Sequence, residues 1–282
     1  MQKNSLDSRL IRLALKEDIG KGDITTGALG LKGQNGRAAV FAKSDGVISG
    51  VDQFKAVFRT LSSKVSFSTY IKNGGKVFSG DRVIRVAGPL DSLLTGERAA
   101  MNILSHLSGV ATLTAKFVEK IKGFPAKILD TRKTLPGMRA WEKAAVKHGG
   151  GTNHRHGLYD MYLIKENHIA GAGGILKALG TIRKHSLKTG AKIEIEVRNI
   201  TELRIVLPFR PDYILLDNFS SRHLKKAVEI TKAESRKTVL EASGNINLKN
   251  VAGVAASGVD RISIGALTHS APALDLSFRI SD

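Results

Sequence analysis

The chain has 282 residues, of which 42% are hydrophobic and 24% charged, and it contains no cysteine. This composition is ordinary for a globular protein and excludes disulfides, thiolate metal sites and a cysteine nucleophile. Lys and Arg outnumber Asp and Glu by 44 to 25, a net charge of +19 that favours anionic partners such as nucleic acid, membrane surfaces or phosphorylated metabolites. Neither a signal peptide nor an apolar run of roughly 20 residues is apparent, so we expect a cytoplasmic protein without a membrane partner.

The first third of the chain predicts a mixed unit of helices and antiparallel strands. Leucines at helical spacing indicate an opening helix that is capped by Ser5 or Asp7 and ends near residues 20–23. Period-two alternation between turn residues predicts strands at 37–42, 46–50, 65–70 and 82–86, with a helix over 51–61. A long amphipathic helix over 92–121 follows, in which Gly109 permits a bend or the close approach of another helix. We assign residues 1–106 to an N-terminal α/β sandwich domain, to which the tail 268–282 returns.

From residue 126 onward, short apolar strands alternate with helical segments. The expected strands are 127–131, 162–165, 192–197, 213–217, 238–242 and 261–264. Such alternation is typical of a parallel sheet, and this number of strands favours closure into a barrel. The prediction is therefore an α/β protein whose catalytic domain, residues 107–267, is an incomplete or irregular TIM-like α/β barrel.

Charged or phosphate-compatible groups lie in or directly after each of these strands, where parallel barrels carry their chemistry. The groups are Asp130 to Lys133, Lys165 to His168, Glu194 and Glu196, Asp217 and Asn218, Glu241 to Asn245, and Gly265 and Ala266. We interpret this convergence, with its Arg and Lys, as a site for a phosphorylated, strongly anionic substrate.

Two glycine-containing segments follow the last two strands, where barrels often bind phosphate. They are Ser243-Gly244-Asn245 and Ile264-Gly265-Ala266, and glycine lets backbone N–H groups approach an anion closely. Glu196 and Asp217 are interpreted as the anions of this basic mouth. They either hold Mg²⁺ together with substrate phosphates and water or pair with Lys165 and Lys133.

The loop Gly149 to Gly157 carries His154 and His156 around Arg155. A zinc site is disfavoured, because zinc needs further ligands and Arg155 would repel a cation. A clamp for carboxylates fits better, since the planar guanidinium fork matches a carboxylate.

The same segments resemble the quinolinate phosphoribosyltransferase family in order along nearly the whole chain. The segments that match are Glu17 to Thr26, Glu97 to Asn102, Asp130-Thr131-Arg132-Lys133-Thr134, Gly149 to Arg155, Gly157 to Asp160, Leu163 to Lys165, Leu216-Asp217-Asn218-Phe219 and Gly265 to Ser270. The resemblance implies that quinolinate and phosphoribosyl pyrophosphate react, with Mg²⁺, to give nicotinate mononucleotide, CO2 and pyrophosphate in NAD biosynthesis. It also implies a homodimer, with a higher oligomer possible, in which the sandwich domain packs against the partner's barrel.

The resemblance further implies a role for each site residue. Arg132, His154 and Arg155 would hold quinolinate, together with Arg98 from the other subunit. Lys133 and Lys165 would face the diphosphate, and Glu196 and Asp217 the ribose hydroxyls and Mg²⁺. The phosphoribosyl group would be bound by Thr131, Lys133, Lys165, Ser243, Gly244, Asn245, Ile264, Gly265 and Ala266.

Two positions depart from the family pattern. Glu166 stands in place of the usual Asp after Lys165, and we expect its extra methylene to shift the group that it orients, Lys165. His156 stands in place of an apolar residue. Neither departure removes a direct ligand.

Three other functions compete with this interpretation. A Schiff-base aldolase would use Lys165 or Lys133 as its nucleophile. A phosphoribosyltransferase acting on a different base is a closer competitor. A nucleic-acid binder would explain the net charge, but aromatic residues are only 5% and no basic run is interleaved with them for base stacking. We therefore expect no specific nucleic-acid partner.

Overall fold

The computed structural model describes residues 3–281, which divide into two compact units. The first unit comprises Met1–Ala115, Leu135–Gly150 and Ser270–Asp282, and the second comprises Lys116–Thr134 and Gly151–His269. The long helix α4 (Leu90–Lys120) begins in the first unit and ends in the second. No helix among residues 3–281 combines the length and apolar character needed to cross a bilayer.

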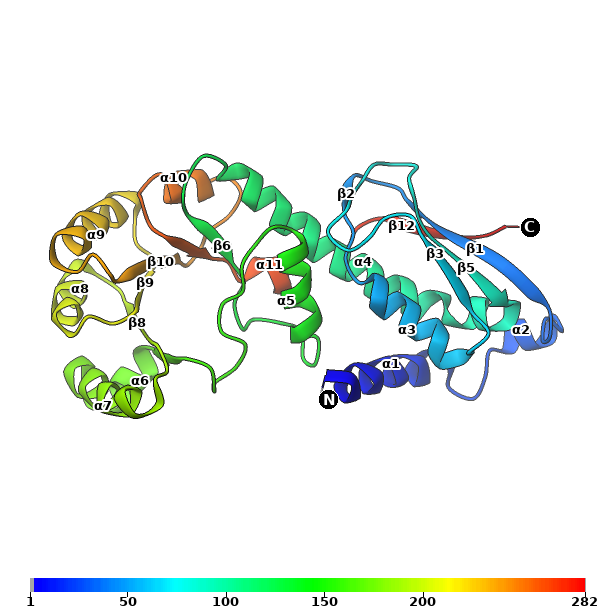
Figure 1. The fold of residues 1–282 in the computed structure, drawn as a ribbon, viewed down its shortest axis with the longest axis horizontal. Helices are drawn as coiled ribbons and strands as arrows, with labels where there is room; N and C mark the ends of the chain where they lie inside the picture. The colour runs from blue at the N-terminus through cyan, green and yellow to red at the C-terminus, as the bar shows by residue number, and fades with distance from the viewer. Residues whose placement is uncertain (1–2, 282) are drawn as a thin grey trace. The chain divides into compact units, whose positions relative to one another are not determined.

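An antiparallel sheet forms the centre of the first unit, in the order β12-β1-β5-β3 (Figure 1). Its strands are β1 (Asn35–Ala42), β3 (Ser66–Thr69), β5 (Arg82–Pro89) and β12 (Leu276–Ser281). β12 comes from the C-terminal tail and pairs with β1. The predicted strands and the helix α3 (Val51–Leu61) are confirmed, although the strand expected at 46–50 shortens to β2 (Gly46–Val47), which pairs with β4 (Lys76–Val77).

Helix α3 packs on the apolar face of this sheet. Phe58 stacks on Phe278 of β12 at 6.0 Å between ring centroids and lies 6.4 Å from Phe67 of β3. These aromatic contacts follow from alternation, because every second residue of each strand faces the helix. The other helices of this unit are α1 (Lys3–Ile19), α2 (Ile24–Ala28) and α5 (Arg139–His148).

The predicted cap of α1 is wrong. The helix already begins at Lys3, so Ser5 and Asp7 lie within it. The Asp7 carboxylate instead accepts a hydrogen bond from Trp141 Nε1 at 2.8 Å. A tertiary contact with α5 therefore uses the side chain that local sequence assigned to capping.

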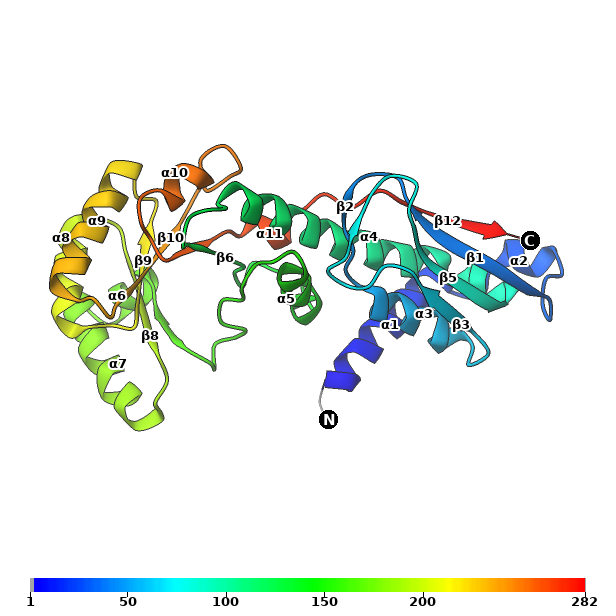
Figure 2. The same ribbon diagram turned by 45° about the horizontal axis from the view of Figure 1, so that its top comes forward.

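The second unit is built on a parallel sheet in the order β6-β11-β10-β9-β8-β7, with helices outside it (Figure 2). Its strands are β6 (Lys127–Leu129), β7 (Tyr162–Ile164), β8 (Ile193–Val197), β9 (Tyr213–Asp217), β10 (Val239–Ser243) and β11 (Arg261–Ser263). Its helical segments are α6 (Glu166–Gly171), α7 (Ile175–Thr189), α8 (Ile200–Val206), η1 (Leu207–Phe209), α9 (Ser221–Glu234), α10 (Val251–Ala255) and α11 (Ala266–His269).

The fold class is confirmed, and the barrel is incomplete as predicted, although the number of strands had favoured closure. Strands β6 and β7 are the two ends of the sheet formed by the described residues, and they do not pair with each other. The chain between them includes α5 and then Gly149 and Gly150, the latter at a φ of +87°, and it contributes only an isolated bridge from Thr152 to Leu129. This open edge is where the loop that carries His154 and Arg155 enters the unit.

Helix α4 tolerates a close crossing because Gly109 has no side chain. A Cβ at this position would run into the backbone of Pro272 and Ala273, which lie in the same unit. The close approach predicted at Gly109 is therefore real, but it is made by the non-helical C-terminal segment that leads into β12 and not by another helix.

We predict that Gly109→Ala lowers the free energy of unfolding by about 2 kcal/mol, because the backbone at Pro272 must shift to accept the methyl group. Thermal denaturation would measure the change. Gly180→Ala is the matched control, since it also lies within a helix but its Cβ would meet no described atom within 4 Å. That control should stabilise the helix by about 0.5–1 kcal/mol. Equal melting temperatures for the two variants would contradict the prediction.

Candidate functional site

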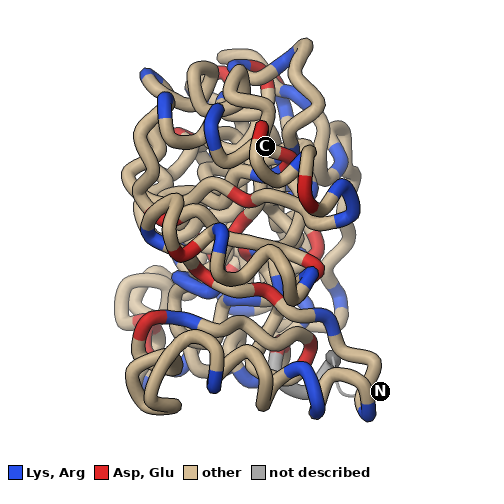
Figure 3. The backbone as a smooth tube through the Cα atoms, turned by 90° about the vertical axis from the view of Figure 1, so that its left-hand side faces the viewer, with Lys and Arg blue, Asp and Glu red and all other residues tan. Residues whose placement is uncertain are grey.

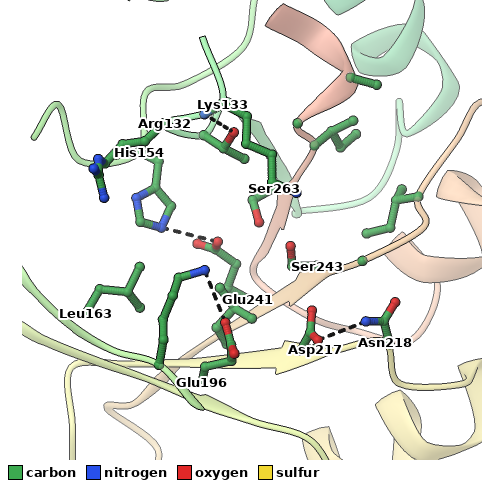
Figure 4. Close-up of a pocket in the computed structure, with 18 of the residues that line it drawn as sticks. Arg132, Lys133, His154, Leu163, Glu196, Asp217, Asn218, Glu241, Ser243 and Ser263 are labelled. Atoms are coloured by element: carbon green, nitrogen blue, oxygen red, sulfur yellow. Dashed lines mark hydrogen bonds and ion pairs between the residues drawn. The ribbon is translucent and has the colours of Figure 1, made fainter. Parts of the chain in front are cut away.

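The carboxyl ends of the parallel strands surround a cavity of about 910 Å³ (Figure 4). Its wall includes the following residues that the sequence predicted: Thr131, Arg132, Lys133, His154, Arg155, Lys165, Glu196, Asp217, Ser243, Gly244, Asn245, Ile264, Gly265 and Ala266. Arg98 is not among the lining residues. It lies on α4 in the first unit, with its side chain 68% exposed.

Strand register brings these side chains onto one face of the sheet. Glu196 of β8 is opposite Leu215 of β9, which is opposite Glu241 of β10. Ser243 is opposite Asp217 one pleat further along. Residues paired in this way point to the same side of a sheet, so adjacent strands present their polar groups to one cavity.

Two arginines approach each other in the cavity wall. Burial and the charge of Arg132 lower the pKa of Arg155 below its usual range. Arg155 donates from Nη1 to the carbonyl of Met161 at 3.0 Å, whereas its buried Nε has no hydrogen-bond partner among the described residues. A buried, unpaired guanidinium donor beside a second guanidinium is suited to an anionic ligand.

The lysines of the cavity are held by different contacts. Lys165 Nζ lies 3.2 Å from Glu196 Oε2. The backbone at Lys133 is fixed at both ends, because its N–H donates to Thr131 Oγ1 at 3.0 Å and its carbonyl accepts from Thr268 Oγ1 at 2.6 Å. Both arrangements leave an ammonium group at the wall of the cavity.

The turn at Gly244, after β10, is hydrogen-bonded to the end of β9. Gly244, Asn218 and Asn245 have φ values of +95°, +56° and +51°, the left-handed conformation that favours glycine and asparagine. Asn245 Nδ2 donates to Asn218 Oδ1 at 3.0 Å, and Asn218 Nδ2 donates to Asp217 Oδ2 at 2.8 Å. A Cβ on Gly244 would collide with Asn218. Backbone N–H groups held in such a turn can approach an anion closely.

The backbone also comes close to the cavity at Gly265, directly after the strand β11 and Ile264. A Cβ there would come within 3.0 Å of Lys133 Cδ and 3.1 Å of His269 Nε2. Glycine at this position therefore keeps the cavity open between the two basic side chains.

Two buried carboxylates lie beside His154. His154 Nε2 is 3.0 Å from Glu194 Oε2 and 3.4 Å from Glu241 Oε1, and both glutamate side chains are almost completely buried. Burial opposes the charge of His154, but the hydrogen bonds and charges of Glu194 and Glu241 raise its pKa. Burial, followed by the charge of Glu241, raises the pKa of Glu194.

The structure corrects two expectations about charge. Glu196 and Asp217 are not the only acidic residues of the cavity, because Glu241 also lines it. Glu166 pairs with Arg198 and not with Lys165. Its carboxylate accepts from Arg198 Nη1 at 3.0 Å, while Lys165 pairs with Glu196. His156, the other departure from the family pattern, does not line the cavity. Its N–H donates to the Asp160 carboxylate.

Sequence reasoning missed several residues that line the cavity. They are Leu163, Leu215, Asn218, Glu241, Ile246, Ser263 and His269. Glu241 and Asn218 stood in segments that were noticed but had no assigned role. His269 follows Gly265 by four residues at the end of the matched segment, and its position in a short helix could have indicated a side chain directed toward the same strand end.

Comparison with known proteins identifies the family. The family model for the quinolinate phosphoribosyl transferase N-terminal domain matches residues 23–108, and the model for its C-terminal domain matches residues 110–279. The chain belongs to the quinolinate phosphoribosyltransferase family.

Individual relatives agree over nearly the full length. The chain is 41% identical over 266 residues to a probable carboxylating nicotinate-nucleotide pyrophosphorylase of Synechocystis, covering 94% of this chain and 90% of the relative. It is 40% identical over 271 residues to the corresponding protein of Mycobacterium leprae, covering 94% of each. The nicotinate-nucleotide pyrophosphorylase structure from Francisella tularensis superposes with a TM-score of 0.92 at 40% identity, covering 99% of this chain and 97% of the other.

We predict that Gly244→Ala weakens the binding of inorganic diphosphate by about tenfold or more, because the methyl group would displace Asn218 and the turn that supports the cavity wall. Titration calorimetry would measure this affinity. Gly258→Ala is the control, because Gly258 shares a positive φ of +90° but does not line the cavity. Undiminished diphosphate binding by Gly244→Ala would show that the turn does not contribute to an anion site.

Proposed function

We propose that the enzyme transfers a phosphoribosyl group from phosphoribosyl pyrophosphate to quinolinate and releases CO2 and pyrophosphate, giving nicotinate mononucleotide for NAD biosynthesis. One observation carries this proposal: Arg132 and Arg155 converge in a cavity that also contains the turn at Gly244 and the lysines Lys133 and Lys165. Adjacent guanidinium groups suit a dicarboxylate, and the turn with the lysines suits phosphates. The names of the relatives agree with this reaction.

In this mechanism the arginines orient the ring and the lysines receive the leaving group. The ring nitrogen uses its lone pair to form a bond to the anomeric carbon while the bond from that carbon to the diphosphate oxygen breaks. Lys133 and Lys165 stabilise the negative charge that develops on the departing diphosphate. The nitrogen is then positively charged, so the adjacent carbon can retain the electron pair when its carboxylate leaves as CO2, and a solvent proton takes the vacated position. Catalysis rests on orientation and electrostatics, without a covalent enzyme intermediate.

Glu196 and Asp217 fit a magnesium ion that is bound mainly through substrate. They lie on adjacent strands at one cavity wall, and Mg²⁺ commonly uses one or two carboxylates together with phosphates and water. A bound Mg²⁺ would neutralise charge on the diphosphate. In the protein alone, Glu196 pairs with Lys165 and the Asp217 carboxylate accepts from Asn218.

A homodimer in which Arg98 completes the partner's site belongs to the same proposal, and so does a cytoplasmic location. Arg98 has a mostly exposed side chain whose nearest ion pair is with its neighbour Glu97 at 4.0 Å. A long exposed arginine is available to a carboxylate outside its own unit. Higher assemblies are compatible with this arrangement.

The competing functions find less support in the site. A Schiff-base nucleophile must be a free amine, whereas Lys165 forms an ion pair with Glu196. For a nucleic-acid binder, Lys and Arg would be expected to gather on one surface, but Figure 3 shows them dispersed along the backbone. If the five basic residues of the proposed site are left out, the net charge falls from +19 only to +14. Most of the excess positive charge therefore lies elsewhere in the chain.

We expect the purified protein to form nicotinate mononucleotide from quinolinate and phosphoribosyl pyrophosphate in the presence of Mg²⁺. Chromatographic detection of the product would test this. With nicotinate in place of quinolinate, kcat/KM should fall by about 100-fold or more, because one carboxylate and its charged hydrogen bonds, each worth about 1.5–3 kcal/mol, are missing. Equal turnover of both acids would exclude the dicarboxylate clamp.

Mixing two inactive variants would test the shared site. Arg132→Ala and Arg98→Ala should each lose about 100-fold or more in kcat/KM while remaining folded, since each lacks charged hydrogen bonds to the substrate. In a statistical mixture of dissociated and reassembled dimers, activity should recover to about one quarter of wild type, because half of the dimers contain one intact site. An active Arg132→Ala variant would refute its role. A mixture as inactive as its components would show that Arg98 does not act across the dimer.

A further inference from the structure

We propose that Glu194 and Glu241 are positioning residues, which act through His154 to hold Arg155 in place for one carboxylate of the substrate. The inference rests on the proposed function and extends it to two acidic residues for which the reaction itself supplies no role. It is carried by the contacts of the buried cluster formed by His154, Glu194 and Glu241.

The cluster is held by three strands and the loop at the open edge of the sheet. Glu194 lies on β8 and Glu241 on β10, while the His154 N–H donates to Asp130 Oδ1, directly after β6, at 2.9 Å. His154 Nε2 faces both glutamates, and Figure 4 shows its contact with Glu241. The imidazole therefore connects a loop without regular secondary structure to the two interior strands.

The other ring nitrogen connects the cluster to Arg155. The Arg155 N–H donates to His154 Nδ1 at 2.7 Å. Both ring nitrogens of His154 thus face protein groups, and a proton on Nε2 is directed to the carboxylates. The sequence resemblance placed His154 among the direct ligands of quinolinate. These contacts give His154 a further role, that of orienting the neighbouring arginine.

The guanidinium group of Arg155 has an unused hydrogen-bond donor. Its Nη1 is used by Met161, but its Nε is buried without a hydrogen-bond partner among the described residues. The backbone of such an arginine must be held in place, because a shift of the main chain displaces the whole side chain from its ligand. The hydrogen bond to His154 supplies that fixation at the backbone nitrogen.

The buried glutamates are costly unless they serve such a purpose. Two carboxylates within 4.8 Å of one imidazole nitrogen repel each other and have lost most of their hydration. An apolar pair would pack the same interior without that cost, but it would not accept the Nε2–H of His154. The need for carboxylate acceptors next to Nε2 of His154 therefore explains why two glutamates are buried here.

A divalent metal is the other occupant that this cluster could accept. His154, Glu194 and Glu241 are the group of potential metal ligands that lies close enough together within the described part of the chain. The positive charges of Arg155 and Arg261, which both interact electrostatically with Glu194, disfavour a bound cation. Metal analysis of the purified protein gives a direct answer: one equivalent of zinc that is lost in Glu194→Gln would overturn the positioning role.

Binding of phthalate tests the proposal without requiring turnover, because phthalate has the two adjacent carboxylates of quinolinate on a ring without nitrogen. Calorimetry should show that Glu194→Gln and Glu241→Gln each weaken phthalate binding by about tenfold or more, as expected for the misplacement of one charged hydrogen bond. Diphosphate binding should change by less than about twofold, because the turn at Gly244 is untouched. Glu234→Gln is the control, since it removes an exposed carboxylate whose partner is Arg204 at 3.5 Å.

Kinetics provide a second readout that a general loss of structure would not reproduce. Both glutamine variants should raise the KM for quinolinate while the KM for phosphoribosyl pyrophosphate stays within about twofold. Glu241→Asp keeps the charge and should recover part of the loss. Should one glutamine variant fail to fold, the other provides the same comparison. Unchanged phthalate binding in a folded glutamine variant, or equal losses for phthalate and diphosphate, would overturn the proposal.

The wild-type protein separates this inference from the function on which it rests. Phthalate binding without turnover of quinolinate would reject the proposed function, while the variants would still report on positioning. Turnover of quinolinate together with wild-type phthalate affinity in both variants would reject the positioning role alone. A wild-type protein that binds neither phthalate nor quinolinate would reject both.

Discussion

Mutual repulsion among cations is the constraint on which this site depends. Burial and then the charge of Arg132 lower the pKa of Arg155, and two lysines share the same cavity wall. Such groups stay together only where the fold fixes their backbones or supplies opposite charge. Thr131 and Thr268 fix the backbone at Lys133, Glu196 pairs with Lys165, and Glu241 supplies negative charge beside His154. Binding of an anionic substrate then reduces the repulsion among these cationic side chains.

The parallel sheet makes this convergence possible with short strands. Each strand ends at the same edge, so residues that are far apart in sequence become neighbours in space. Register decides which of them face the cavity: Glu196, Leu215 and Glu241 are paired across three strands. A slip of one residue in any strand would turn its polar group to the opposite face. The chemistry of the site is therefore encoded as much in strand pairing as in residue type.

Sequence patterns predicted the elements and most of the cavity wall for the same reason. Apolar strands followed by Asp130-Thr131-Arg132-Lys133 or by Ser243-Gly244-Asn245 place those segments at the strand ends, whatever the exact twist of the sheet. The alternation Ile193-Glu194-Ile195-Glu196 contained the signal for inward-facing carboxylates, but alternation alone cannot say whether the polar face of a strand meets solvent or an interior. The role of Glu194 emerged only with its distance to His154.

The failures of prediction have equally specific causes. Asp7 satisfies the local rule for a helix cap, yet its carboxylate bonds to Trp141, 134 residues away. Glu166 was linked to Lys165 by adjacency, whereas its partner Arg198 follows a different strand. Long-range pairing of this kind depends on how the strands are ordered, and the position of a residue in sequence does not contain that order.

The open edge of the sheet links the irregular fold to the chemistry. In a closed barrel, β6 would pair along its length with a strand, and backbone hydrogen bonds would occupy both of its sides. Here Thr152 makes a single bridge to Leu129, and the chain then turns so that Asp130 binds the N–H of His154. The side chains that follow can enter the cavity from the edge, a direction unavailable to residues that extend from strand ends. Leaving the barrel incomplete thus allows Arg155 to approach Arg132 from another element, and two guanidinium groups that come from different segments can address two carboxylates at once.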